Sequence, residues 1–402
     1  MPMPETNHHP GRNYLRCREL YLPERRADLN VVILEGPRIV GLGRSGDIPA
    51  GAKVIERPGL VAGPGLIDLH CHGGQGSDFA DGTPADITTV VRCHLAAGTT
   101  TMLATVASCS PAETLQALAT VRALKQGGLA GLHGVHLEGP WFSPAWFGCH
   151  LGEVIRDINP EEVARLRGYS DVISWITLAP ELPGALDLIR EFTRLGAVCA
   201  IGHSSASLRQ IRAAMAAGLS HATHLWNAMP RAQRSPIVLE PGVLESVLMI
   251  EELSTEIIGD GIHVGAALVE FTHRIKGTRQ LALVSDALRG YGLGPGDYAF
   301  GPRSGQMCRL LDEPRVGVVP GSEPLKLASS AIALADTLRI LSRSTAIPLA
   351  ELWEMASLTP ARKLGIDQER GRLAPGHTAD LLLLDADLAV AEVWKDGVSL
   401  PH

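Results

Sequence analysis

Several features that mark whole classes of protein are missing or scarce in this chain of 402 residues. No apolar run approaches the roughly 20 residues that a membrane-spanning helix needs. The first 20 residues carry charges and prolines where a signal peptide has an apolar core. The seven cysteines form no Cys-x-x-Cys pair, and this odd, scattered set indicates reduced thiols rather than a disulfide framework. The sequence therefore predicts a cytoplasmic protein with no membrane partner.

An excess of positive charge is also missing. The chain has 36 lysines and arginines against 43 aspartates and glutamates, a formal charge of −7, which argues against a protein whose main task is to bind nucleic acid. Charged residues make up 20% of the chain and hydrophobic residues 45%, so the chain can bury a large core and is not intrinsically disordered. We expect one large globular unit together with a smaller one.

The sequence after Pro64 alternates short apolar segments with helical stretches of about 10 to 15 residues, a pattern typical of repeated βα units and a parallel sheet. The helices have recognisable starts. Ser110 followed by Pro111 and Glu113, for example, is a capping box with proline at the first helical position. Eight candidate strands predict a closed α/β barrel. They are Leu66–His70, Thr100–Leu103, Gly134–Leu137, Trp175–Leu178, Ala197–Ile201, Ala222–Leu225, Thr255–Ile258 and Leu281–Val284.

The two ends of the chain have a different pattern. From about Glu19 to Pro58, short β-type runs are broken by turns, and two further strands are expected at Asp380–Asp385 and Val390–Lys395. We therefore expect the ends to build one small β domain, with the barrel inserted between them. The predicted boundaries are residues 1–62 and 366–402 for the small domain and 63–365 for the barrel.

The C-terminal ends of the predicted strands are rich in histidine and carboxylate. In a βα barrel the loops converge at that end, and active sites form there. His70 and His72 close the first strand and, because side chains alternate along a strand, both imidazoles face the same side. Other strands end in, or lead into, Glu138, His203, His224, His263 and Asp286.

Histidine and carboxylate side chains that meet in this way suit a divalent metal such as Zn²⁺, whose catalytic sites use three protein ligands and leave one position for water. Each residue alone also has a structural interpretation: His203 can be a buried histidine with satisfied hydrogen bonds, and Asp286 can cap a helix. Their joint occurrence at several strand ends favours the metal site. His94 and His133 do not lie at strand ends, and we interpret them as structural or surface residues.

Longer strings around these residues are more specific than the single positions. Those from His136 to Pro140 and from Ala222 to Pro230 belong to one group of deacetylases, whereas His70-Cys71-His72 is shared more widely. On these strings the chain resembles the amidohydrolase superfamily and, within it, the N-acetylglucosamine-6-phosphate deacetylase family, over about residues 20 to 400. Further matching strings are Pro64–Gly73, Thr177–Glu181, Ile201–Ser204, Asp260–Val264, Val284–Ala287 and Leu358–Ala361.

The resemblance implies a (β/α)₈ barrel with a small β sandwich and a metal-dependent hydrolase. Its reaction would remove the acetyl group from an N-acetyl amino-sugar phosphate, converting N-acetylglucosamine 6-phosphate to glucosamine 6-phosphate and acetate. One alternative is the same amide chemistry on another small N-acyl substrate, such as a different N-acyl hexosamine or an N-acyl amino acid. Another is a scaffold that has lost catalysis, but every ligand position and Asp286 is present.

The resemblance also implies roles for single residues. Asp286 matches the catalytic acid and base, and His150 matches the histidine beside the scissile carbonyl. Some relatives keep the first histidine pair and hold two metal ions. The presence of His70 and His72 therefore leaves open whether this chain binds a second ion. The main metal ligands are matched by Glu138, His203 and His224, and the substrate-binding positions by Asn227, Ala228 and His263.

Two loops depart from the family pattern. The usual Arg-x-Pro-Gly type of segment is missing after strand six, where Arg231 and Arg234 are the nearby basic residues. The guanidinium of an arginine can bind two phosphate oxygens at once. The distance of Arg234 from the Asn-Ala-Met-Pro string is nearer the family's than that of Arg231, which favours Arg234. The alternative is that both arginines are solvated loop charges. In relatives the corresponding arginine reaches into the neighbouring subunit, so the resemblance implies a homodimer. After Asp286, Leu288–Tyr291 replace small residues in a loop that borders the substrate in the family.

Overall fold

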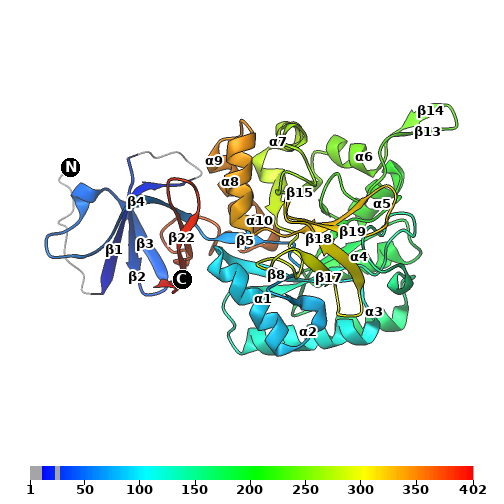
Figure 1. The fold of residues 1–402 in the computed structure, drawn as a ribbon, viewed down its shortest axis with the longest axis horizontal. Helices are drawn as coiled ribbons and strands as arrows, with labels where there is room; N and C mark the ends of the chain where they lie inside the picture. The colour runs from blue at the N-terminus through cyan, green and yellow to red at the C-terminus, as the bar shows by residue number, and fades with distance from the viewer. Residues whose placement is uncertain (1–10, 23–27, 402) are drawn as a thin grey trace.

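The computed structural model describes residues 11–22 and 28–401. Within these residues the largest sheet has eight parallel strands, which confirms the predicted (β/α)₈ barrel (Figure 1). All eight predicted strands are present, with ends shifted by a few residues. In sheet order they are β5 (Leu66–Asp68), β8 (Thr99–Ala107), β9 (Leu132–Glu138), β10 (Ile173–Leu178), β11 (Val198–Ile201), β12 (His221–Ala222), β15 (Ser254–Ile258) and β16 (Leu281–Val284).

The first and last strands of this sheet meet just beyond their C-terminal ends. The backbone N–H of Asp286 donates to the carbonyl of His70 at 2.8 Å, and the N–H of His72 donates to the carbonyl of Ala287 at 3.0 Å. These bonds bring the two predicted histidines of strand one beside the predicted carboxylate of strand eight.

Helices cover the outside of the barrel, which explains why its strands are apolar and buried on both faces. The predicted capping box is confirmed: the backbone N–H of Ser110 donates to Glu113 at 2.9 Å, and the N–H of Glu113 donates to the Ser110 hydroxyl at 3.3 Å. The described helices are α1 (Pro84–Ala96), α2 (Pro111–Gln126), α3 (Pro160–Arg167), α4 (Ala185–Arg194), α5 (Leu208–Ala217), α6 (Val243–Met249), α7 (Ala266–Gln280), α8 (Leu334–Ser344), α9 (Leu349–Met355) and α10 (Leu358–Leu364). None of them combines the length and apolar character needed to cross a bilayer.

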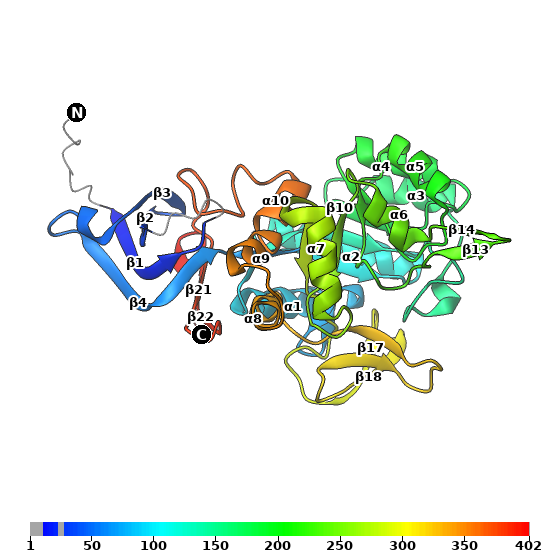
Figure 2. The same ribbon diagram turned by 90° about the horizontal axis from the view of Figure 1, so that it is seen from above.

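The predicted small β domain is built from both ends of the chain and lies to one side of the barrel (Figures 1 and 2). It has its own core, in which Leu15, Leu34 and Trp394 are buried. Strand β4 (Lys53–Pro64) passes the predicted boundary at residue 62 without a break. The domain boundaries at 1–62, 63–365 and 366–402 therefore stay predictions. Among the described residues its sheet has the order β23 (Val398–Ser399), β22 (Val390–Lys395), β21 (Leu381–Leu384), β4 (Lys53–Pro64), β1 (Arg12–Leu20), β2 (Val31–Glu35) and β3 (Arg38–Gly43).

A four-stranded antiparallel sheet, which the sequence analysis did not predict, follows barrel strand β16 and stands off one side of the barrel (Figure 2). We call it the inserted sheet. Arg289 was expected in a loop bordering the substrate, but its guanidinium is buried and donates to the carbonyl of Ala299 at 2.7 Å and to Asp81 at 3.0 Å. It therefore anchors the inserted sheet. The strands, among the described residues, are β17 (Gly296–Phe300), β18 (Gln306–Leu310), β19 (Val316–Val319) and β20 (Lys326–Ser330).

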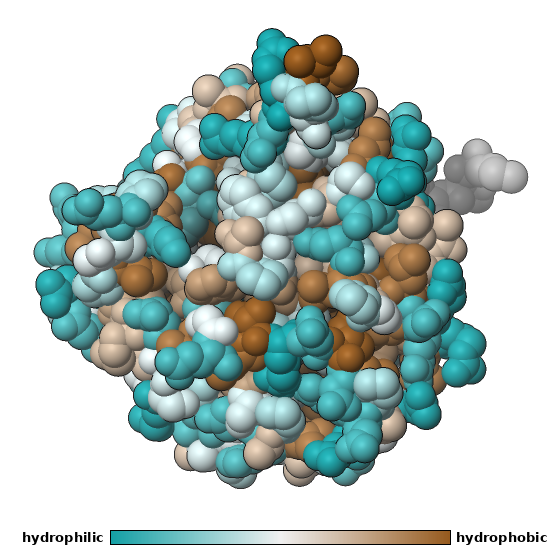
Figure 3. Space-filling model, turned by 90° about the vertical axis from the view of Figure 1, so that its right-hand side faces the viewer, coloured by the Kyte–Doolittle hydropathy of each residue, from teal (hydrophilic) through white to brown (hydrophobic). Residues whose placement is uncertain are grey.

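A short hairpin of β13 (Gln233–Ser235) and β14 (Val238–Glu240) projects from the barrel on the side opposite the small domain (Figures 1 and 2). Its turn exposes large apolar side chains, with Ile237 79% and Leu239 60% exposed. Figure 3 looks onto this side of the molecule and shows apolar side chains at the top of the face, where the hairpin lies. Exposed apolar side chains grouped in this way are typical of surfaces that contact another protein.

Candidate active site

The side chains predicted at the strand ends surround a cavity of about 350 Å³ at one end of the barrel. His70 lies directly behind this lining, buried against His72. The cavity therefore unites the predicted metal-ligating, catalytic and substrate-binding positions, with the exception of Arg234. Those that line it are His72, Glu138, His150, His203, His224, Asn227, Ala228, His263 and Asp286.

Three of these residues converge on one point, and we call them the first group. The Nε2 atoms of His203 and His224 lie 3.0 Å apart, and each is 3.2 Å from Oε1 of Glu138. All three side chains are buried. Nδ1 of His203 lies 2.9 Å from the carbonyl of Trp146 and must donate to it, so in the neutral ring Nε2 carries a lone pair toward the cavity.

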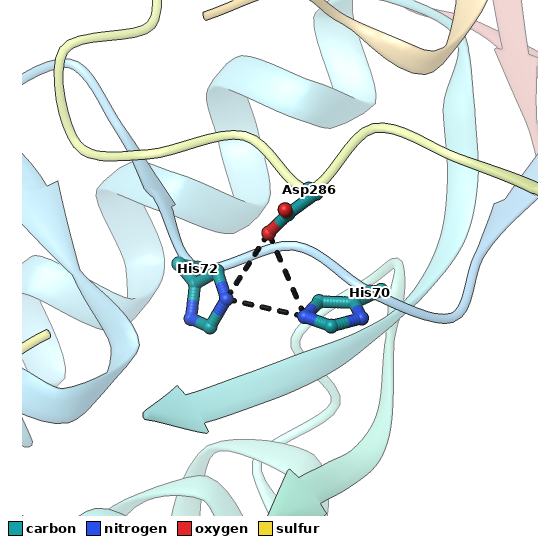
Figure 4. A group of neighbouring side chains, drawn as sticks. All are labelled: His70, His72 and Asp286. Atoms are coloured by element: carbon teal, nitrogen blue, oxygen red, sulfur yellow. Dashed lines mark hydrogen bonds and ion pairs between the residues drawn. The ribbon is translucent and has the colours of Figure 1, made fainter. Parts of the chain in front are cut away.

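A second group lies beside the first and consists of His70, His72 and Asp286 (Figure 4). The Nε2 atoms of His70 and His72 are 3.2 Å apart. Oδ1 of Asp286 lies 3.2 Å from Nε2 of His72 and 3.6 Å from Nε2 of His70. Glu138 joins the two groups, because its Oε2 is 3.2 Å from Nε2 of His72 while its Oε1 faces the first group.

The charges of the two groups depend on burial and on each other. Burial opposes the charged form of Glu138, but the neighbouring histidines outweigh it and hold the pKa of this carboxyl well below its usual range. The pKa of Asp286 is lowered in the same way. Burial lowers the pKa of His203 to about 4, whereas for His72 the carboxylates outweigh burial and raise the pKa to about 9. A positive charge in the second group is thus stabilised by two carboxylates.

These donors fit a divalent cation. Imidazole nitrogens and carboxylate oxygens of this kind are the ligands that Zn²⁺ and similar ions prefer. The lone pair of His203 Nε2 points at Oε1 of the ionised Glu138, 3.2 Å away. Without a proton or a cation between them, such buried atoms repel each other. A divalent ion would satisfy all of them at once.

His150 differs from the other histidines in the way it is held. The backbone N–H of Ser108 donates to its Nδ1 at 3.3 Å, so Nε2 carries the proton in the neutral ring. This N–H lies 3.3 Å from Oε2 of Glu138, and Phe142 and Phe300 pack edge-on against the ring. His150 is therefore placed with an N–H directed into the cavity, and its ring also lies close enough to Glu138 and His203 for the three side chains to hold a metal ion together.

Strand β12 is shorter than predicted, and its early end shapes the substrate side of the cavity. It stops at Ala222, because His224, Trp226 and Ala228 adopt positive φ angles of 27°, 83° and 48°. Non-glycine residues rarely adopt this conformation, and it is concentrated at functional sites. The turn directs His224 into the first group and places Asn227 and Ala228 in the cavity wall.

His263 closes another side of the cavity. Its Nδ1 lies 2.7 Å from Oδ2 of Asp260, whose Oδ1 also accepts the backbone N–H of His263 at 2.9 Å. Burial disfavours the charged ring, but the hydrogen bond to Asp260 and its charge outweigh burial and raise the pKa of His263. A fixed N–H donor at this position suits an oxygen-rich ligand.

The inserted sheet supplies cavity residues that the sequence analysis missed. Phe300, Lys326 and Ser329 line the cavity, and the Ser329 hydroxyl donates to Asp286 at 3.1 Å. Lys326 is exposed, lies over the ring of Phe147 at 5.6 Å, and is the sole lysine or arginine in the described lining. Exposed and buried residues alternate in β18, but the exposed Met307 is apolar, so polar and apolar residues do not alternate regularly in the sequence and gave no signal for this sheet.

Arg231 and Arg234 are not among the described residues that line the cavity of their own chain. Both are exposed. Arg234 lies in β13 of the projecting hairpin, where its guanidinium donates to the carbonyl of Ile237 at 2.8 Å. A role for Arg234 in substrate binding thus requires that the hairpin reach another molecule.

Comparison with known proteins agrees with this geometry. The model of the Amidohydrolase family matches residues 61–400. An N-acetylglucosamine-6-phosphate deacetylase of Vibrio furnissii is 34% identical over 83% of this chain and 81% of its own. An N-acetylgalactosamine-6-phosphate deacetylase of Escherichia coli O157:H7 is 32% identical over 87% and 90%.

Among solved structures, the N-acetyl-D-glucosamine-6-phosphate deacetylase of Mycobacterium smegmatis superimposes with a TM-score of 0.87 at 30% identity, covering 97% of this chain and 99% of that one. That structure is a mutant in complex with N-acetyl-D-glucosamine-6-phosphate. Fold, strand-end residues and sequence matches agree over most of the length: the chain belongs to the amidohydrolase family.

Proposed function

We propose that this protein is a metal-dependent deacetylase of N-acetyl amino-sugar phosphates, which hydrolyses N-acetylglucosamine 6-phosphate to glucosamine 6-phosphate and acetate. The observation that carries the proposal is the pairing, in one cavity, of the ionised Asp286 with the N–H donor of His150 across the first group. The named activities of the relatives support the choice of substrate.

We assign the first group, Glu138, His203 and His224, as the ligands of one divalent ion, which we propose to be Zn²⁺. We assign His70 and His72 as ligands of a second ion. The ion supplies, when bound, a positive charge that polarises a carbonyl oxygen and makes water more acidic. The tautomer of His203 fits this role, because Trp146 already accepts its other N–H.

Asp286 and His150 divide the proton chemistry. Asp286 takes a proton from the attacking water, whose oxygen bonds to the acetyl carbon, and returns that proton to the amide nitrogen as the C–N bond breaks. The N–H of His150 donates to the acetyl oxygen as negative charge develops on it. The Ser329 hydroxyl, which donates to Oδ1 of Asp286, holds the carboxylate in place. The acetic acid that forms gives its remaining proton to the amine, so the products are acetate and the protonated amine.

We assign Asn227, Ala228 and His263 to the sugar phosphate. They form the wall that follows β12 and β15, next to the first group.

The cytoplasmic location expected from the free thiols stays a prediction.

A homodimer would complete this wall. Arg234 is carried on a projecting hairpin with an apolar turn, and α7 exposes Leu268, Phe271 and Ile275, which lie on one face of the helix. Trp226, in the cavity lining, lies 6.3 Å from the Phe271 ring, so this stripe begins at the edge of the site. We propose that a second copy covers it and that its Arg234 binds the phosphate.

The proposed reaction is tested by measuring acetate release, with the metal content determined in the same samples. The substrates are the 6-phosphates of N-acetylglucosamine and N-acetylgalactosamine and unphosphorylated N-acetylglucosamine. We expect turnover of a 6-phosphate and loss of both metal and rate in Glu138→Ala. A full metal equivalent with near-normal turnover in that variant would contradict the ligand assignment, and equal turnover of all three substrates would favour a broader N-acyl hydrolase.

The shared site has its own test. Arg234→Ala should raise KM for the 6-phosphate and leave turnover of the unphosphorylated sugar unchanged. Asp286→Asn and Arg234→Ala chains, each weak alone, should regain activity when mixed, because the mixed dimer contains one site with both an intact Asp286 and a partner arginine. A monomer in gel filtration, or no recovery on mixing, would place Arg234 outside the site.

A further inference from the structure

A buried glutamate beneath the second group has no role in the mechanism described so far. Glu256 lies in the middle of barrel strand β15 and is 0% exposed. Its Oε1 is 2.7 Å from Nδ1 of His70. In Figure 4 one nitrogen of the His70 ring faces His72 and Asp286, and the other points away from them. Glu256 holds that second nitrogen.

This contact fixes the tautomer of His70. An ionised carboxylate can only accept hydrogen bonds, so Nδ1 of His70 must donate. In the neutral ring Nε2 then carries a lone pair. This atom lies 3.2 Å from Nε2 of His72 and 3.6 Å from Oδ1 of Asp286. An uncharged His70 is therefore held ready to accept a cation from the cavity side.

His72 lacks such support. Its Nδ1 has no hydrogen-bond partner among the described residues, and its ring packs edge-on against Phe300 of the inserted sheet, with 4.7 Å between the ring centres. Of the two histidines in the second group, His70 is held at its Nδ1 by a carboxylate, whereas His72 contacts carboxylates through its Nε2 alone among the described residues. The affinity of the second group for a cation thus depends on Glu256.

Glu256 also reaches the first group. Its Oε1 accepts the backbone N–H of His224 at 3.3 Å, at the residue where the chain turns to a positive φ. On its other side, Oε2 lies 3.4 Å from Nε2 of His221, whose Nδ1 contacts the Ser254 hydroxyl at 2.7 Å. One carboxylate is therefore shared by a backbone turn and two imidazoles.

We propose that Glu256 is a positioning residue that makes His70, His72 and Asp286 a second cation site. This inference rests on the proposed function, since it takes the first group as the site of the first ion. Carboxylates behind a ligating histidine orient the ring and raise its basicity, and their loss typically costs about 10–100-fold in metal affinity. We expect a loss of that size for the second ion alone.

The test is the number of Zn²⁺ ions retained per chain when the full-length protein is dialysed against buffers of graded free Zn²⁺, measured by mass spectrometry. Glu256→Gln is the variant of choice, because its amide oxygen can still accept the His224 N–H while the charge is lost. Ser254→Ala is the matched control on the same buried strand, because its hydroxyl contacts His221 at 2.7 Å and the carbonyl of Ser220 at 2.9 Å.

Wild type and Ser254→Ala should show two binding steps, and Glu256→Gln should show an unchanged first step and a second step weakened by about 10–100-fold. Thermal unfolding of metal-free samples checks that both variants fold. A single step in wild type, an unchanged second step in Glu256→Gln, or equal loss in Ser254→Ala would each overturn the inference. If wild type binds two ions as described but hydrolyses no N-acetyl sugar phosphate, the proposed function fails and the second site stands.

Discussion

The barrel end and the inserted sheet line the same cavity but hold their side chains in different ways. Glu138, His203 and His150 of the barrel end are at most 4% exposed, and each is held by contacts to its neighbours. Lys326 of the inserted sheet is exposed, and its described contact is the ring of Phe147. The two regions therefore differ in the precision with which they place chemical groups.

This difference indicates a division of labour. Proton transfer and metal binding need groups held within fractions of an ångström, which buried strand ends provide. Choice and admission of substrate tolerate looser contacts, which an added surface sheet provides. Ser329 is the point where the two regions meet, since its hydroxyl donates to Asp286. Variants in each region test whether the two contributions are separate.

The largest effect is expected at the barrel end, in Asp286→Asn. The amide cannot take up and return a proton, so kcat should fall by about 10²–10⁴-fold while the chain folds and keeps the ion of the first group. Acetate release and metal analysis of the same sample measure this. Activity within tenfold of wild type would move the acid and base role away from this strand end.

His150→Phe should have the next largest effect. Loss of an N–H donor to a developing oxyanion costs about 2.7–4 kcal/mol, or roughly 10²–10³-fold in kcat. Because Nδ1 of His150 accepts from Ser108, we expect no change in metal content. This separates His150 from the true ligands. A variant that loses one metal equivalent would make His150 a ligand instead of a donor.

A smaller effect concerns the junction between the two regions and its dependence on pH. His94 of α1 stacks on Tyr291 at 4.7 Å, in the loop toward the inserted sheet, and its Nε2 lies 2.9 Å from the Gly73 carbonyl. Burial lowers the pKa of His94 to about 4. The unfolded chain, with a pKa of about 6.5 for histidine, therefore binds the proton more readily than the folded chain.

The stabilisation from neutral His94 is thus fully present above pH 6.5 and is lost as pH falls from about 6.5 to 4. The free energy of unfolding should decline in that window by at most about 1.4 kcal/mol per pH unit from this residue. Urea unfolding at pH 7.5, 5.5 and 4.5 measures the slope, which should be shallower in His94→Gln. Equal slopes would mean that His94 does not contribute to acid sensitivity.

The smallest effect is expected in the inserted sheet itself, in Lys326→Met. An exposed charge contributes at most about 1 kcal/mol, so KM should rise by no more than about fivefold with kcat unchanged. Arg309→Met is the matched control, because Arg309 is an exposed cation of the same sheet that pairs with Asp297. A tenfold loss of kcat in Lys326→Met would give the inserted sheet a part in the chemistry.

The same division explains what could be predicted from the sequence. The barrel strands are apolar and evenly spaced between helices, and their last residues are chemically distinctive, so strands and cavity residues such as Glu138 and His203 could be predicted together. In the inserted sheet the strands are short and half-exposed. Met307 is 47% exposed and Cys308 1%, and an alternation over so few residues is easily taken for a loop.

Other parts could not be predicted for physical reasons. The early end of β12 depends on positive φ angles at His224 and Ala228, which no side-chain pattern announces. The role of His150 followed only from the family resemblance, because it lies in a loop. Glu256 did leave a signal: a carboxylate inside a predicted barrel strand must find a buried partner, and that partner is His70.

The pairing of β21 with β4 has a consequence for folding during synthesis of the chain. Leu381 lies opposite Pro64, so the last strands of the chain complete a sheet begun by the first. A ribosome adds about 5–20 residues per second, which leaves β4 with an open edge for roughly 15 to 60 seconds. Such an edge can pair with the wrong strand. In the cell, completion of this sheet therefore waits until β21 has been synthesised, long after the barrel's first strands have emerged.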